Sequence, residues 1–225
     1  PGSEWGYHRF IMDSHGGEGR IKIDGDITEL AYSHDKDYGL RGLFENCTAL
    51  IQAPQCTLYE EGSRKNFFDS TFSGCTNLKS VPDIIGSKMA PYCYANMFEG
   101  CTSLENAPSL NSTELAQSCY SNMFEGCTSL EKGPELPATT LQETCYKAMF
   151  AGWTGLKESP YLPAKKLVKN CYYAMFMGCF NLNTVNVGLN DWNDKESICT
   201  EIHISDFKCF FNFCNFLHFF ACSCC

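Results

Sequence analysis

The apolar positions of this chain recur every 26 residues. Phenylalanines follow this step from Phe98 to Phe176, and leucines follow it from Leu78 to Leu182. One further leucine, Leu50, precedes Leu78 by 28 residues. A fixed period of this size is typical of stacked supersecondary units rather than of one closed globule. The pattern therefore predicts a solenoid of about six units, each burying the same columns of side chains.

Within one unit, the spacing of apolar residues predicts a short helix over roughly 140–152. Three apolar residues lie four positions apart and would share one helical face. This stripe comprises Leu141, Cys145 and Met149. Thr140 and Glu143 have the spacing of a capping box, and Gly152 would end the helix. About ten helical residues are marginal alone in water, so neighbouring units would have to supply the missing stability.

After each glycine, a short extended segment is expected, as in 104–108, 130–134 and 156–160. One proline recurs at the same register of these segments. The column comprises Pro54, Pro82, Pro108, Pro134 and Pro160. Because proline cannot donate to a β-ladder, this column indicates the edge of a strand. Each unit should then be a strand, a turn and a helix, which makes the fold an α/β repeat.

The ends of the chain differ from this array, which we place at 39–187. Residues 1–38 contain the alternating segment Arg20–Asp24, which predicts a strand in an N-terminal β cap or the end of an upstream domain. At the other end, Asn186 stands where the next proline would be. Residues 188–225 form a Phe- and Cys-rich tail without helical or alternating pattern. It is either a metal-binding or lipid-modified segment or, as we favour, a sequence translated outside its natural frame or altered by truncation.

Nine of the 16 cysteines fall into two columns of the repeat. These are Cys93, Cys119, Cys145 and Cys171, and Cys47, Cys75, Cys101, Cys127 and Cys179. Disulfides between stacked units, metal ligands and simple core packing are the three alternatives. The seven-residue separation within a unit is no recognised zinc spacing. Phe67 and Trp153 each replace a column cysteine, which favours core packing because a large aromatic side chain can form neither a bridge nor a thiolate ligand.

The repeated phrase Met-Phe-x-Gly-Cys-Thr-Ser-Leu, followed by Pro-x-Leu-Pro-Ala-Thr-Thr-Leu at 134–141, resembles the BspA-like leucine-rich repeat proteins. These are abundant in Bacteroides-type bacteria and also occur in some parasitic protists. The resemblance covers about Leu40 to Val187. It implies a leucine-rich-repeat solenoid on a secreted or surface-attached protein, and several such proteins are adhesins. The departures are Trp153 for cysteine, Phe180 for threonine, and the tail.

Charge and motifs narrow the possible functions. The net charge of −9 argues against nucleic acid, which requires Lys and Arg to neutralise phosphates. No nucleophile elbow, P-loop, H-E-x-x-H or dinucleotide fingerprint occurs, so we expect no enzyme, no cofactor and no metal site. No run of 18 apolar residues and no signal peptide is present in this chain, so no membrane span is expected. His8, His15, His34, His203 and His218 all lie outside the regular array.

The outward positions of the extended segments should form the concave surface of the solenoid, where a partner would bind. The candidate binding residues are Lys79, Glu105, Glu131, Lys132, Lys157 and Glu158. Opposite charges on neighbouring units would stabilise one another by ~0.2–1 kcal/mol per pair. A second candidate surface, if their rings reach solvent, comprises Tyr94, Tyr120, Tyr146, Tyr172 and Tyr173, although we favour half-buried rings that seal the layer of predicted helices.

Two function classes remain open at this stage. The first is an extracellular or cell-surface recognition module, monomeric, that binds a protein or glycan ligand. The second is a structural spacer or accessory domain of a larger surface protein or enzyme. A spacer predicts no tight ligand for the isolated array.

Overall fold

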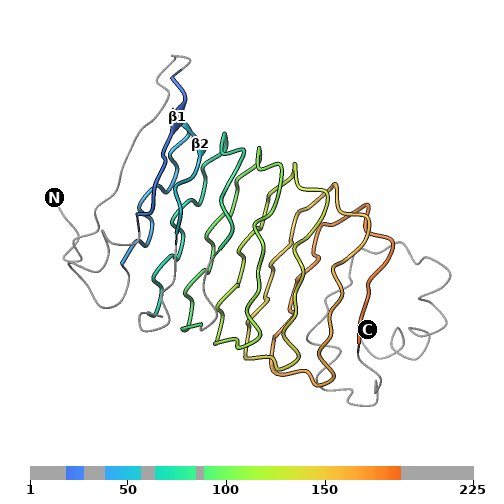
Figure 1. Cartoon of the computed structure of the whole chain (residues 1–225). Coiled ribbons are helices and arrows are strands. Elements are labelled where there is room, and N and C mark those ends of the chain that lie inside the picture. Colours follow the sequence, from blue (N-terminus) through green and yellow to red (C-terminus); the bar gives the residue numbers. More distant parts are fainter. Residues whose placement is uncertain (1–18, 28–38, 57–63, 85–88, 189–225) are drawn as a thin grey trace.

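The computed structural model describes residues 19–27, 39–56, 64–84 and 89–188. These residues form a stack of coils that lie side by side along one axis, from the N-terminal strands to residue 188 (Figure 1). Each coil has one face of tight turns and one face of extended chain. We call these the turn face (40–47, 66–75, 92–101, 118–127, 144–153 and 170–179) and the strand face (79–83, 105–109, 131–137, 157–163 and 183–187). The repeat array predicted from the period of 26 is confirmed.

The two regular strands lie at the N-terminal end. Strand β1 (Ile21–Lys22) pairs in parallel with β2 (Leu50–Gln52), and Ile21 is in register with Leu50. The strand predicted within Arg20–Asp24 is therefore confirmed. Most of 1–38 and all of the tail after residue 188 lie outside the described residues.

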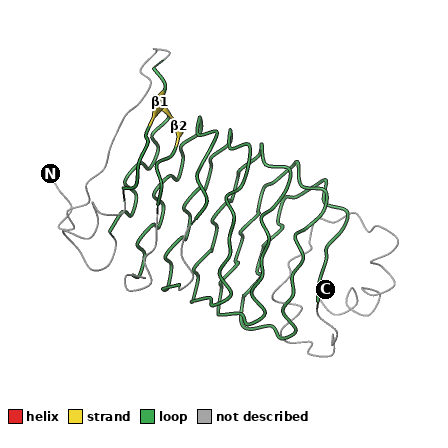
Figure 2. Cartoon of the chain, in the orientation of Figure 1, coloured by secondary structure: helices red, strands yellow, loops and turns green. Residues whose placement is uncertain are grey.

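The strands expected in the later coils are reduced to single bridges such as Gln52 with Ser80 and Glu158 with Thr184. Figure 2 shows the described chain beyond β2 as loop and turn. The proline column explains this, because each proline removes one donor from the ladder. The prediction of a strand in every unit was wrong.

The predicted helices are also absent from the described ranges, where the turn face consists of consecutive tight turns (Figure 2). Between Thr144 and Trp153 every second amide donates to the carbonyl three residues earlier, as Met149 does to Tyr146 at 3.3 Å. The turn between them has positive φ at its third residue, Ala148 (φ 50°), which is the signature of a type II turn. Nor does the described chain contain a helix long and apolar enough to cross a membrane.

A left-handed residue at every fourth position prevents a helix here. In the coil 144–153, φ is positive at Thr144, Ala148 and Gly152. A right-handed helix would require negative φ at each of them. The apolar pairs also repeat every four residues, and this spacing resembles the i, i+4 stripe of a helix. Four-residue turns keep these pairs on one side, so the sequence spacing was right and the helix inferred from it was wrong.

The remaining turn-face amides join neighbouring coils. In the coils 66–75, 92–101, 118–127 and 144–153 each of them donates to a carbonyl of the following coil, as Tyr94 does to Cys119 at 3.0 Å and Phe98 does to Met123 at 2.9 Å. From residue 66 onward, five such bonds link each pair of coils, with lengths of 2.7–3.1 Å. The turn-face ladder therefore satisfies backbone donors that a helix would have satisfied internally.

The core contains two columns of stacked aromatic rings. The phenylalanine column runs from Phe44 to Phe176 with successive centroids 5.5–6.4 Å apart. The second column begins at Phe68 and continues through tyrosines to Tyr172 at 5.4–5.9 Å. Tyr94, Tyr120, Tyr146 and Tyr172 are at most 4% exposed, so these four are not a binding surface, whereas Tyr173 beside them is 37% exposed. Like side chains lie over like, as the repeat predicts.

The column cysteines are core residues, as the sequence indicated. All ten described cysteines are buried thiols, not disulfides. In the second column the thiol reaches the coil before it, as Cys127 Sγ does to the carbonyl of Phe98 at 3.0 Å. Trp153 takes the same place and donates its indole Nε1–H to the carbonyl of Phe124 at 2.6 Å. Tryptophan can replace cysteine here because both supply an apolar body and one hydrogen-bond donor to the same type of acceptor.

Candidate functional site

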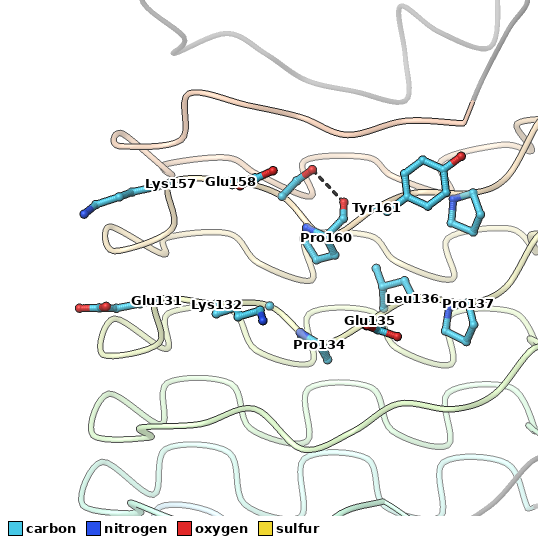
Figure 3. Close-up of a pocket in the computed structure, with 13 residues that line it drawn as sticks. Glu131, Lys132, Pro134, Glu135, Leu136, Pro137, Lys157, Glu158, Pro160 and Tyr161 are labelled. Atoms are coloured by element: carbon cyan, nitrogen blue, oxygen red, sulfur yellow. Dashed lines mark hydrogen bonds between the residues drawn. The ribbon is translucent and has the colours of Figure 1, made fainter.

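A groove of about 690 Å³ opens on the strand face between the coil segments 131–137 and 157–163 (Figure 3). Both segments contribute charged and apolar side chains. Its lining comprises Glu131, Lys132, Gly133, Pro134, Glu135, Leu136 and Pro137 on one bank, and Lys157, Glu158, Ser159, Pro160, Tyr161 and Pro163 on the other. The volume lies within the range of small-molecule and peptide pockets.

The groove lies where the backbones of two coils are not joined. Within the described residues, no backbone hydrogen bond links 131–137 to 157–163. Prolines on both banks remove donors, and the ring of Pro160 packs against the backbone of Gly133. A Cβ built at Gly133 would lie only 2.7 Å from Pro160 Cγ. The coils therefore meet through a proline ring at this point, while the charged side chains of both banks and Tyr161 are exposed.

The 157–163 bank is held in place by the next coil. The amide of Ser159 donates to the carbonyl of Thr184 at 2.9 Å, and that of Leu162 donates to Asn186 at 2.8 Å. Asn186 also donates its side-chain amide to Glu158 Oε1 at 2.8 Å. Asn186 stands at the position of the column proline, and its side chain fixes the orientation of a groove carboxylate.

Tyr161 is the largest exposed side chain of the groove, at 59% exposure. Its hydroxyl end lies close to the backbone of Gly188, where an added Cβ would be only 2.7 Å from the oxygen. The ring therefore extends from the 157–163 bank toward residue 188. An exposed aromatic ring next to carboxylates can stack on a sugar or anchor an apolar side chain of a protein.

Four of the six predicted binding residues line this groove. They are Glu131, Lys132, Lys157 and Glu158. The other two, Lys79 and Glu105, lie outside it and pair with each other at 3.6 Å with side chains 62% and 61% exposed. An ion pair this exposed contributes little to stability.

The charge pairing predicted across the other coils is not formed. In the described structure neither Glu131 with Lys157 nor Lys132 with Glu158 lies within ion-pair distance. Figure 3 shows the side chains of Glu131 and Lys157 directed away from the groove at its end. Because these coils lack a ladder at this point, their side chains are not held opposite each other. The groove charges are therefore not neutralised by cross-coil ion pairs.

Sequence reasoning missed Tyr161 and Gly133. Each differs from the residues at the same position of the other repeats. Tyr161 stands where the earlier repeats have Asp83, Ser109 and Glu135, and Gly133 stands where the other repeats have residues with side chains. A bulky residue in an otherwise polar column, with a glycine on the coil before it, was the available signal. The charge columns indicated the strand face but not the position of the groove in it.

The buried thiols have little reactivity. Burial raises the pKa of Cys75, Cys93, Cys127 and Cys145 to about 12, and that of Cys179 to about 11. The thiolate, not the thiol, is the nucleophile and the metal ligand. Within the described ranges, no group of three or more His, Cys, Asp or Glu side chains is placed to hold a metal ion. All five histidines lie outside those ranges.

Comparison with known proteins gives one structural similarity. No protein-family model and no curated protein matches the chain. A leucine-rich cell surface protein from Faecalibacterium prausnitzii aligns with 83% of this chain at 14% identity and a TM-score of 0.34. The chain spans 66% of that protein's structure, just under two thirds.

Proposed function

We propose that the chain is a non-enzymatic recognition module of the BspA-like leucine-rich repeat type, exported or held at a cell surface. It binds a protein or glycan through the groove between 131–137 and 157–163. The observation that carries the proposal is the coincidence of three features in the groove: Tyr161 is exposed, the backbones of the banks are not joined, and the charges are not paired across the coils.

The chemistry of the groove suits recognition rather than catalysis. Proline rings and Tyr161 offer a rigid apolar surface at low entropic cost, and the carboxylates of Glu135 and Glu158 accept hydrogen bonds from hydroxyl or amide groups. A ligand would complete hydrogen bonds that the coils leave to water. The groove has neither a nucleophile beside a base nor a cluster of metal-ligating side chains. We therefore propose that no reaction takes place there.

Glycan and protein arrays probed with the whole chain test this function. Tyr161→Ala should weaken any ligand found by about tenfold or more, as removing a central aromatic anchor does. Lys79→Ala is the matched control, because it removes an exposed strand-face side chain outside the groove. Equal binding by the Tyr161→Ala variant would place the ligand elsewhere. Clean failure on both arrays would favour the alternative, a structural spacer.

A further inference from the structure

The two banks of the groove leave no room for a ligand strand between their backbones. An added Cβ at Gly133 would lie 2.7 Å from Cγ and 3.2 Å from Cδ of Pro160, so the banks are already in contact there. On its other side the 157–163 bank is bonded to the next coil through the amides of Ser159 and Leu162. Strand addition requires a free backbone edge. A ligand of the groove must therefore be recognised mainly by side chains.

The exposed side chains of the groove form two facing pairs. Lys132 and Glu158 occupy the same position of consecutive repeats, and so do Glu135 and Tyr161. All four side chains are exposed, and the members of each pair lie on opposite banks (Figure 3). Along each bank the second pair lies three residues after the first, which is ~10 Å of extended chain. The groove thus presents two neighbouring contact points, one with a donor and an acceptor and the other with an acceptor and an aromatic ring.

The charges of the groove favour a ligand that carries no charge itself. Both carboxylates and ammonium groups line it, and in the described structure Lys132 and Glu158 are not within ion-pair distance of each other. An anionic ligand would be repelled by Glu135 and Glu158, and a cationic ligand would be repelled by Lys132. Hydroxyl groups donate to carboxylates and accept from ammonium groups, so a ligand rich in hydroxyls can use both signs of charge at once.

One of these acceptors is held in position before any ligand binds. The side-chain amide of Asn186 donates to Glu158 Oε1 at 2.8 Å, and the backbone amide of Asn186 donates to Ser159 Oγ at 2.8 Å. The Ser159 hydroxyl donates in turn to the carbonyl of Pro160 at 2.8 Å. The carboxylate of Glu158 therefore offers its second oxygen, Oε2, in a defined orientation. Such preorganisation lowers the entropic cost of binding.

We propose that the ligand of the groove is an uncharged oligosaccharide. One sugar ring stacks its C–H face on Tyr161, which is 59% exposed, and donates a hydroxyl to Glu135 on the facing bank. The next sugar ring places its hydroxyl groups between Glu158 and Lys132. This inference rests on the proposed function, because it names the class of ligand for the same groove.

Arrays that carry uncharged and acidic oligosaccharides of matched length, together with unmodified peptides, test the ligand class on the whole chain. Uncharged oligosaccharides should bind. The Kd of the strongest of them should change less than about twofold between about 0.05 and about 0.5 M NaCl, because no ion pair forms on binding. Binding of peptides alone, or of acidic oligosaccharides with a strong dependence on salt, would overturn the inference and leave the recognition function in place.

Titration of the strongest uncharged oligosaccharide with variants tests its position in the groove. Tyr161→Phe should bind within about twofold of the parent because the ring is kept, whereas Tyr161→Ala should bind about tenfold or more weakly. Glu158→Ala should also weaken binding by about tenfold or more. Asn186→Ala should weaken it by about three- to tenfold, because Glu158 is no longer held. Glu105→Ala is the matched control, since it removes an exposed strand-face carboxylate outside the groove, and it should bind as the parent does.

Thermal unfolding of each variant, unchanged from the parent, checks that the losses are local. Parent-like binding by both Tyr161→Ala and Glu158→Ala would place the oligosaccharide elsewhere and overturn the inference. Equal binding by Tyr161→Ala and Tyr161→Phe, with Glu158→Ala still weak, would contradict the stacked ring. The absence of any ligand on the arrays would overturn the recognition function together with the inference.

Discussion

Two alanine-to-glycine substitutions in one coil distinguish the turn structure from a helix. Ala148 and Ala151 are both buried, at 6% and 2% exposure, and pack in the same small cluster with Ala174. They differ in backbone conformation, because φ is +50° at Ala148 whereas Ala151 is not in the left-handed region. Glycine adopts positive φ without steric strain, so it removes strain at a left-handed position. At a right-handed or extended position it only adds conformational freedom to the unfolded chain.

The expected loss in the free energy of unfolding has three contributions. Each substitution loses a buried methyl group, worth ~0.8 kcal/mol. Each also raises the entropy of the unfolded chain by ~0.4–1 kcal/mol. Ala148→Gly recovers the ~1–2 kcal/mol that an L-residue spends in the left-handed conformation. Ala151→Gly should therefore cost about 1.5 kcal/mol and Ala148→Gly close to zero by these values.

Urea unfolding followed by tryptophan fluorescence, to which the buried Trp153 contributes together with Trp5 and Trp192, measures both costs in the same protein. Coincidence with the circular-dichroism transition should be checked, because repeat arrays can lose two-state behaviour. A helix over 144–152 would make both substitutions cost alike, at ~1.5–2 kcal/mol. Equal losses would refute the turn structure of this face.

Three further predictions concern the core and the turn face. Trp153→Phe loses the indole donor to Phe124 and should lower the free energy of unfolding by ~1–2 kcal/mol. Trp153→Cys should lower it by ~3–5 kcal/mol because the smaller side chain leaves a cavity. Equal losses in denaturant unfolding would contradict this. The ten described cysteines should resist iodoacetamide at pH 8 until the protein is denatured, since burial keeps them protonated, and rapid native labelling seen by mass spectrometry would be inconsistent with this. Burial first, and then the neighbouring carboxylates, raises the pKa of Glu99, so the native state binds its proton more tightly and stability should fall as pH rises through that pKa. Glu99→Gln should therefore be more stable than the parent at pH 7, with the gain vanishing below pH ~4 in thermal unfolding.

The sequence alone determined the array and its core. A period of 26 residues requires that like side chains lie over like, so the leucine, phenylalanine and cysteine columns could be assigned without a structure. The replacement of a column cysteine by Trp153 already indicated packing. These inferences hold because they depend on which residues recur, and burial in a stacked array follows from recurrence.

The local conformation was decided by tertiary contacts. The i, i+4 spacing of Cys145 and Met149 fits both a helix and a run of four-residue turns, and only the neighbouring coils choose between them. Carbonyls of the following coil accept hydrogen bonds from every second amide. These bonds hold Ala148 in the left-handed conformation, which is unfavourable for alanine by itself. The groove is decided in the same way, because it depends on which adjacent backbones fail to bond, and Tyr161 and Gly133 lie on different coils. Recurrence along the chain specifies what is buried, whereas hydrogen bonding between coils specifies the backbone path and the surface that remains open.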